Sequence, residues 1–277
     1  MQPAASRTLE VTPLTDAIGA EVSGLSPGAI SLYDRTVLRA AWHKHHVLVF
    51  RGMPLTEDEQ IDLASSFGTI RKSSAPPTPL ATRPEIMVVS NIRDDGGVAL
   101  GTLPDGEMDW HYDGLHQSVP YTGGILHSIE VPSSGGETRF ANMCRVYASL
   151  PAALKERLTG LNAQSVYDYA ATDRGAKVRD AAAPTAVHPV VRFHEQSKQN
   201  ALFVCRLMTE RILELPEGES TALLEELFGY IERSPDFYEH AWRAGDTVVW
   251  DNRCVTHARN DFDPKQRRYL KRVSVVG

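Results

Sequence analysis

The segment Trp110-His111-Tyr112-Asp113-Gly114 is the part of this 277-residue sequence from which its fold and chemistry can best be predicted. Side chains alternate between the two faces of an extended strand, so His111 and Asp113 are expected to point one way and Tyr112 the other. An imidazole nitrogen and a carboxylate oxygen on one face can occupy neighbouring positions around one small cation. Because a His-x-Asp pair is common by chance, the interpretation depends on the rest of the chain.

A third ligand is available in the segment WDNRCVTH, residues 250–257, where His257 is the best candidate. Two histidines and one carboxylate on one side of a metal ion leave the opposite side open, as in non-haem Fe(II) oxygenases. Another histidine group, His43, His45 and His46, has no carboxylate near it in the sequence. We therefore interpret that group as a helix end that passes into a strand.

Composition limits the class of protein. The formal net charge of -6 argues against a nucleic-acid or membrane-surface partner. Cys144, Cys205 and Cys254 form no Cys-x-x-Cys unit, which disfavours a disulfide scaffold or a zinc ribbon and favours core packing. The N-terminal segment has no apolar run long enough for a signal peptide or a membrane span. The sequence thus predicts a soluble cytoplasmic protein.

Short apolar runs separated by turns dominate the chain. We predict strands over residues 9–11, 19–24, 47–50, 86–90, 124–131, 137–140, 187–193, 201–206, 247–251 and 269–276. Helices are predicted over residues 32–46, from a capping box at Thr56 and Glu59 to Gly68, over 149–160 and over 219–231. Segments 73–84, 94–106 and 165–185 are predicted to be irregular. This pattern is mainly β with flanking helices and predicts a double-stranded jelly roll, a single domain over residues 1–277.

The basic segment 265–272 follows His257. If it is a strand, Arg268, Leu270 and Arg272 share one face. A guanidinium group on an inward face can hold a small carboxylate through two parallel hydrogen bonds. The alternative is a solvated edge strand whose charges discourage aggregation. The position after His257 favours ligand binding.

Four segments together resemble the taurine/2,4-D dioxygenase (TauD/TfdA) family of Fe(II)- and 2-oxoglutarate-dependent oxygenases. They are the His-x-Asp pair, GGET at 135–138, WDNR at 250–253 and QRR at 266–268. The resemblance extends over almost the whole chain and is nearer to the aryloxyalkanoate branch than to the taurine branch. It implies a jelly-roll core and Fe(2+) held by His111, Asp113 and His257, which form the catalytic centre, with 2-oxoglutarate and O2 as co-substrates.

The resemblance also assigns the co-substrate and substrate residues. Arg268 is implied to bind the distal carboxylate of 2-oxoglutarate, with Thr138 donating a hydrogen bond to it. Arg272 is placed near the 1-carboxylate or an anionic substrate. The remaining substrate candidates are Asn91, His116 and Arg71 or Lys72. The loop after Gly68 lacks the histidine that binds sulfonate in the taurine branch, which argues against taurine itself.

The sequence therefore predicts a dioxygenase that hydroxylates a small organic anion, with cleavage of a C–O, C–S or C–N bond as a potential consequence. An aryloxyalkanoate-like substrate is favoured, with a modified amino acid or a sulfonate as the alternative. Desaturation or epimerisation at the same site is also open. From other classes, a zinc hydrolase and a non-catalytic jelly-roll binding protein stay open. No nucleic acid or membrane is expected as a partner, and homo-oligomer formation is left open.

Overall fold

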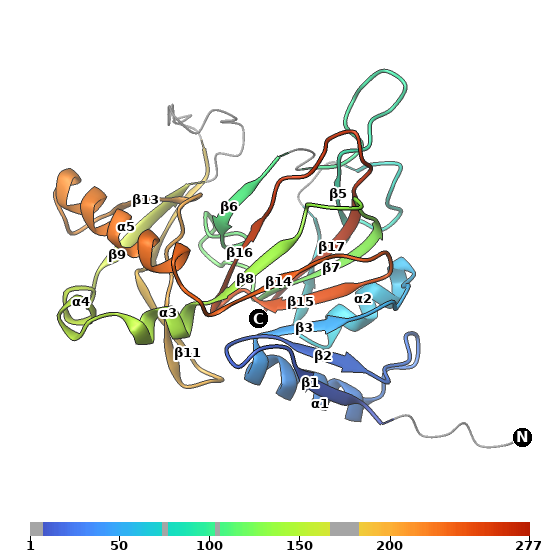
Figure 1. Ribbon diagram of the computed structural model, residues 1–277, viewed down its shortest axis with the longest axis horizontal. Coiled ribbons are helices and arrows are strands. Elements are labelled where there is room, and N and C mark those ends of the chain that lie inside the picture. The colour runs from blue at the N-terminus through green and yellow to red at the C-terminus, as the bar shows by residue number, and fades with distance from the viewer. Residues whose placement is uncertain (1–7, 74–76, 103–105, 167–182) are drawn as a thin grey trace, which may run out of the picture.

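Two β-sheets form the framework of the protein in the computed structural model, which describes residues 8–73, 77–102, 106–166 and 183–277 (Figure 1). The larger sheet contains, in spatial order, β1 (Glu10–Pro13), β2 (Ala20–Ser23), β3 (Val47–Phe50), β15 (Thr247–Asp251), β7 (Gly123–Glu130), β17 (Tyr269–Val276) and β4 (Thr69–Arg71), with β5 (Met87–Ser90) beside β17. The smaller sheet contains β14 (Phe237–His240), β8 (Thr138–Asn142), β16 (Val255–Arg259) and β6 (Met108–His111). This is the jelly roll that the sequence predicts.

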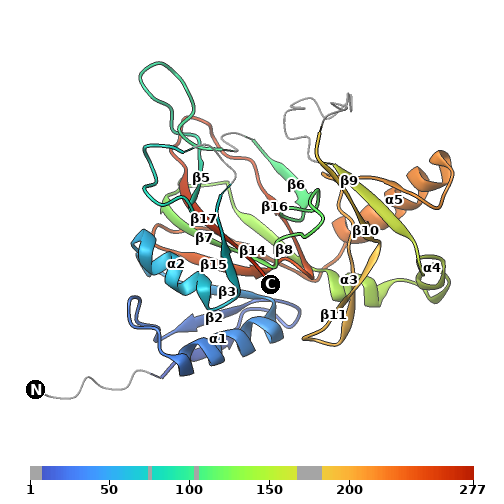
Figure 2. The ribbon, with the colours of Figure 1, turned by 180° about the vertical axis from the view of Figure 1, so that it is seen from behind.

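The central strands of the larger sheet are buried on both faces, and their alternating side chains enter two different cores. Val49 and Val248 pack with residues of the smaller sheet such as Phe140. Leu48 and Val249, on the opposite face, pack under α1 (Leu32–His45) and α2 (Glu57–Ser65), which cover that face of the sheet (Figure 2). This two-sided burial explains why β3 is a continuous apolar run.

Both of these helices begin at a capping box. The Thr56 hydroxyl accepts a hydrogen bond from the backbone N–H of Glu59, and the Glu59 carboxylate accepts one from the N–H of Thr56. Ser31 and Asp34 form the same reciprocal pair at the start of α1. The capping box predicted at Thr56 is therefore confirmed.

The remaining elements lie to one side of the two sheets, at the left of Figure 1. They are β9 (Asn162–Val166), β10 (Thr185–Pro189), β13 (Thr209–Ile212), β11 (Val191–His194), β12 (Gln199–Leu202), α3 (Met143–Ser149), α4 (Ala152–Arg157) and α5 (Glu217–Glu232). The prediction of one strand over 187–193 is wrong, because β10 pairs with β9 while β11 pairs with β12. The strands β4, β9, β13, β14 and β16 and the helix α3 were not predicted. Most of the predicted insert, residues 167–182, lies outside the described residues.

We expect Gly124→Ala to destabilise the fold, because a β-carbon at this position of β7 would lie 2.1 Å from Cζ2 of Trp250. Trp250 is buried and cannot move aside freely, so overpacking is expected to lower the free energy of unfolding by about 1–3 kcal/mol. Thermal unfolding measures the change. Gly218→Ala in α5 is the matched control, because a β-carbon there meets no atom within 4 Å. Equal melting temperatures for the two variants would contradict the close packing of β7 on Trp250.

Candidate functional site

The smaller sheet brings the two histidines of the predicted site together. β16 pairs with β6 in antiparallel register with His257 opposite His111, and the two ring centroids lie 4.0 Å apart. Asp113 lies beyond the end of β6, in a turn, so the prediction that the extended strand continues to Asp113 is wrong. Asn252 holds this turn, since its side chain accepts from the Asp113 N–H and donates to the Asp113 carbonyl, both at 2.9 Å. Ligand atoms of the three side chains lie within 4.8 Å of one another.

The protonation states of these groups suit a metal cation. Burial lowers the pKa of His111 and lowers that of His257 well below its usual value, so both imidazoles are neutral near pH 7. Burial raises the pKa of Asp113, but the positive charge of Arg272 and its hydrogen bond to the carboxylate oppose that effect, and the net pKa is lowered. Two neutral imidazoles and one carboxylate are the donor set that non-haem Fe(II) prefers.

Two observations show where a cation fits. Nδ1 of His111 lies 2.8 Å from the carbonyl oxygen of Asp109; as a donor to that oxygen it leaves the Nε2 lone pair for a metal. Oδ2 of Asp113 is buried without a hydrogen-bond partner among the described residues and lies 3.9 Å from Nε2 of His257. A buried carboxylate oxygen left in this way is costly unless a cation contacts it.

Arg272 contacts the carboxylate of this group directly. Its Nη1 lies 2.6 Å from Oδ1 of Asp113, on the oxygen opposite the one that faces His257. The guanidinium therefore orients Asp113 and keeps it ionised. The sequence predicted Arg272 near a ligand but did not predict this ion pair.

A cavity beside the histidines is lined by Thr138, Arg268 and Arg272, together with His111 and His257. The Arg268 side chain is 3% exposed, and burial together with the nearby charge of Arg259 lowers its pKa to about 9. Within the described part of the chain the Arg268 guanidinium has no carboxylate partner, and it lies over the Phe262 ring, 5.8 Å from the centroid. Such a buried cation favours an anionic ligand.

Asn91 has a role that the sequence did not predict. Its Nδ2 donates to the carbonyl of Gln266 at 2.8 Å, and its Oδ1 accepts from the backbone N–H of Arg268 at 2.8 Å. The amide is thus engaged with the segment that leads into β17. We interpret Asn91 as a residue that fixes the backbone of Arg268.

A second cavity lies on the other side of Arg272. It is lined by Arg71, Lys72, Tyr121 and Arg272, with Met87. The Arg71 guanidinium lies over the Tyr121 ring, 5.1 Å from its centroid, whereas the Lys72 side chain is exposed. His116 is near enough to feel the charges of Asp113 and Arg71, and burial lowers its pKa. Arg272 lines both cavities, so the two lie next to each other.

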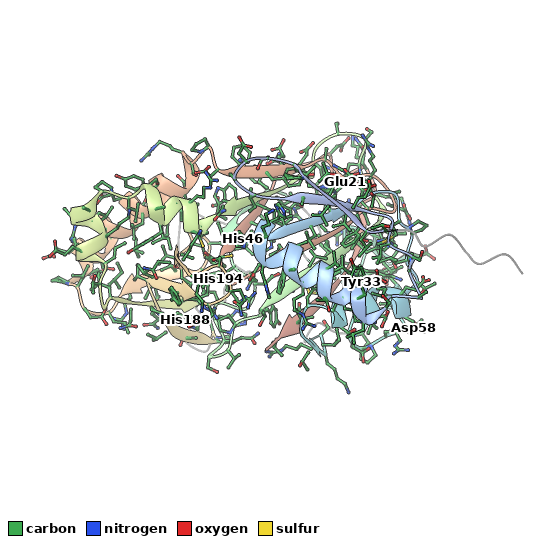
Figure 3. The ribbon with its side chains drawn as sticks, turned by 90° about the horizontal axis from the view of Figure 1, so that it is seen from below. Glu21, Tyr33, His46, Asp58, His188 and His194 are labelled. Atoms are coloured by element: carbon green, nitrogen blue, oxygen red, sulfur yellow. The ribbon has the colours of Figure 1, made fainter. Side chains whose placement is uncertain are left out.

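A different histidine group surrounds Asp251. Ligand-type atoms of His46, His194, Asp251 and Cys254 also lie within 4.8 Å of one another. His46 follows the last residue of α1 and His194 ends β11, and their rings lie side by side (Figure 3). The predicted helix end that passes into a strand is confirmed, because α1 ends at His45 and β3 begins at Val47. The sequence did not show that Asp251 lies near His46, since the pairing of β15 with β3 brings it there. Asp251 accepts hydrogen bonds from Arg253 and lies 3.0 Å from Nε2 of His194. We interpret the group as a hydrogen-bonded support for the turn that precedes His257.

The jelly roll and the cluster of two histidines and one aspartate define the class: a metal-dependent oxygenase of the double-stranded β-helix type. A profile of the taurine catabolism dioxygenase TauD, TfdA family matches residues 10–274. The chain belongs to this family.

Individual relatives agree with the assignment. The chain is 29% identical to an (S)-phenoxypropionate/alpha-ketoglutarate-dioxygenase of Sphingobium herbicidovorans, over 98% of this chain and 96% of that protein. It is 33% identical to an alpha-ketoglutarate-dependent 2,4-dichlorophenoxyacetate dioxygenase of a Burkholderia species, over 83% of this chain and 82% of that protein. A solved taurine dioxygenase from Burkholderia xenovorans superposes with a TM-score of 0.82 at 25% identity, covering 97% and 89% of the two chains.

The protein is therefore a 2-oxoglutarate-dependent dioxygenase, an oxidoreductase that uses Fe(II) with 2-oxoglutarate and O2 as co-substrates. This class replaces the two alternatives that the sequence left open, a zinc hydrolase and a non-catalytic jelly-roll binding protein. The relatives act on small organic molecules. No helix within the described residues has the length and apolar character needed to cross a membrane.

Proposed function

We propose that His111, Asp113 and His257 hold the Fe(II) ion. The proposal is supported by their convergence from β6 and β16, their burial, and the pairing of two neutral imidazoles with an ionised carboxylate. Bound iron supplies the oxidation, in which dioxygen converts a substrate C–H bond to an alcohol while 2-oxoglutarate is decarboxylated to succinate and carbon dioxide. The protein supplies the ligands, the orientation of both co-substrates and a site shielded from water.

The distal carboxylate of 2-oxoglutarate is assigned to Arg268 and Thr138. The observation that carries the proposal is the buried Arg268 guanidinium, which has no acidic partner in the described chain and lines the same cavity as His111 and His257. An Arg–carboxylate pair would offset the cost of burying that charge. Arg272, already paired with Asp113, adds positive charge beside the chelating end of the same molecule.

The substrate is proposed to be a small organic anion of the aryloxyalkanoate type that binds in the second cavity. Arg71 supplies a cation and Tyr121 an aromatic face, the two features that an aryl group bearing a carboxylate needs. His116 borders the same region. Relatives named for (S)-phenoxypropionate and 2,4-dichlorophenoxyacetate support this class, and one named for a sulfate ester keeps sulfur-containing anions as the alternative.

A succinate assay tests the substrate class. The Fe(II)-loaded protein is given 2-oxoglutarate, ascorbate and oxygen with phenoxyalkanoates, alkyl sulfate esters, sulfonates, N-substituted amino acids or the methyl esters of the phenoxyalkanoates. We expect succinate formation above the substrate-free rate with the free acids and much less with their neutral esters. Equal stimulation by acids and esters would contradict recognition of the anion, and stimulation by an amino acid alone would replace the aryloxyalkanoate assignment.

Arg71→Gln is expected to lower kcat/KM for the best anionic substrate by roughly 10- to 100-fold, the value of a lost charge-assisted hydrogen bond. The KM for 2-oxoglutarate should stay unchanged, because Arg71 lines the second cavity and not the one beside Arg268. Steady-state kinetics with both co-substrates varied measures the two effects. Arg83→Gln, at an exposed arginine whose partner is Asp58, is the control. A loss in the control as large as that in Arg71→Gln would exclude a specific role for Arg71.

A further inference from the structure

Trp242, which follows β14, contacts the proposed 2-oxoglutarate site through Thr138. Its indole Nε1 donates a hydrogen bond to Oγ1 of Thr138 at 2.9 Å. An indole N–H can only donate, so the Thr138 oxygen must be the acceptor. Among the described residues no other hydrogen bond of the Thr138 hydroxyl is found, and its own hydrogen is therefore available. Thr138 lines the cavity that Arg268 also lines.

The hydrogen bond from Trp242 limits how the Thr138 hydroxyl can be oriented, because the indole N–H must meet one of its lone pairs. A free threonine hydroxyl can present either its hydrogen or a lone pair to a ligand. With one of its two lone pairs occupied by the indole, the hydroxyl has its hydrogen and one lone pair left, and the hydrogen is the group that an anionic ligand in the cavity attracts. A carboxylate accepts hydrogen bonds and donates none when ionised, so this orientation suits the distal carboxylate of 2-oxoglutarate.

The indole packs on His240, which lies next to the partly buried Arg51–Asp246 ion pair. The Trp242 ring packs edge-on against His240, with centroids 4.4 Å apart, and His240 lies opposite Thr138 in the pairing of β14 with β8. Nε2 of His240 lies 3.3 Å from Oδ2 of Asp246, and Asp246 is paired with Arg51 at 2.6 Å. The contact with His240 and the hydrogen bonds from Gly52 and Arg51 overcome the effect of burial and lower the pKa of Asp246 to about 2, so it is ionised near pH 7.

We propose that Trp242 is a positioning residue for 2-oxoglutarate: it acts through Thr138 and holds that hydroxyl in the orientation in which its hydrogen is donated to the distal carboxylate. The inference rests on the proposed role of Thr138 and deepens it. Among the described residues no hydrogen bond or ring contact joins Trp242 to His111, Asp113 or His257, so its effect should appear in co-substrate affinity and not in metal affinity.

Calorimetric titration of the Mn(II)-loaded protein tests the proposal without turnover. Wild type, Trp242→Phe, Thr138→Val and the double variant are each titrated with 2-oxoglutarate and with 2-oxovalerate, which has a methyl group in place of the distal carboxylate. Because both ligands are measured on one preparation, a loss of folded protein changes the number of sites and not the ratio of affinities. The Mn(II) affinity of each variant is measured as well.

We expect Trp242→Phe to weaken 2-oxoglutarate binding about 5- to 15-fold. The reason is that the hydrogen bond from the Thr138 hydroxyl to the charged distal carboxylate becomes less favourable. The affinities for 2-oxovalerate and Mn(II) should be unchanged. In the Thr138→Val background the Trp242 substitution should have no further effect, because the group through which it acts is absent.

The outcomes separate the two proposals. Additive losses in the double variant, or equal losses for 2-oxoglutarate and 2-oxovalerate, would overturn the inference and leave the role of Thr138 intact. Unchanged 2-oxoglutarate binding in Trp242→Phe beside a loss in Thr138→Val would do the same. Wild-type binding by Thr138→Val would overturn the proposed role of Thr138 and, with it, the inference.

Discussion

His257→Ala is expected to weaken Fe(II) binding by more than about 100-fold and to abolish substrate-dependent succinate formation. Loss of residues that merely support a metal ligand costs 10- to 100-fold, so removal of a ligand should cost at least as much. His257 is buried, its imidazole is neutral, and its Nε2 faces the unpartnered oxygen of Asp113, so no other described group can take its place. Iron content after dialysis against a weak chelator measures the effect.

His45→Ala is the matched control for this prediction. His45 ends α1, on the far side of the larger sheet, and its backbone contact to Gly19 does not depend on the side chain. The control should retain wild-type iron content and activity. If His257→Ala retained its iron, the ligand set of His111, Asp113 and His257 would be wrong.

Arg268→Met is expected to weaken 2-oxoglutarate binding by about 100-fold or more, because loss of one partner of a buried charge pair costs 2–5 kcal/mol. The same substitution should leave the stability of the ligand-free protein unchanged or raise it, because the buried guanidinium has no acidic partner in the described chain and its removal ends a desolvation cost. If Arg268 served only the fold, its substitution would lower stability. Weaker 2-oxoglutarate binding without a loss of stability therefore indicates a role in ligand binding.

Titration calorimetry and thermal unfolding measure the two quantities on one protein preparation. Arg267→Met is the control: its side chain is 62% exposed and is paired with Glu130 on the surface, so little change is expected in either measurement. A fall in melting temperature with unchanged 2-oxoglutarate affinity would show that Arg268 serves the fold and not the ligand.

Much of the framework could be predicted because its signals are local. The apolar run of β3, the capping box at Thr56 and the apolar face of α5 each depend on neighbours within one or two turns of chain. The strand β16 carries no such signal, because all five of its residues are buried although three are polar. Thr256 donates to the His111 carbonyl and Arg259 to the Gly106 carbonyl, partners that are distant in sequence.

The candidate site likewise contains features that could be predicted from the sequence and features that could not. His111, Asp113 and His257 are identifiable by residue type and by resemblance, and the fold brings them together. The Arg272–Asp113 ion pair joins β17 of the larger sheet to the turn that follows β6 of the smaller sheet, and the Trp242–Thr138 hydrogen bond depends on the pairing of β14 with β8. Neither follows from spacing along the chain. The single-domain, cytoplasmic and oligomer assignments stay predictions.

The most direct test of the account is an anaerobic titration of the Fe(II)-loaded protein with 2-oxoglutarate, followed by the visible charge-transfer absorption that develops when a 2-oxo acid chelates Fe(II). For wild-type protein loaded with one Fe(II) per chain, we predict an absorption band that saturates as 2-oxoglutarate is added. The band should be absent in His111→Ala and shifted to far higher 2-oxoglutarate concentration in Arg268→Met. A band of wild-type intensity and affinity in both variants would contradict the proposed site.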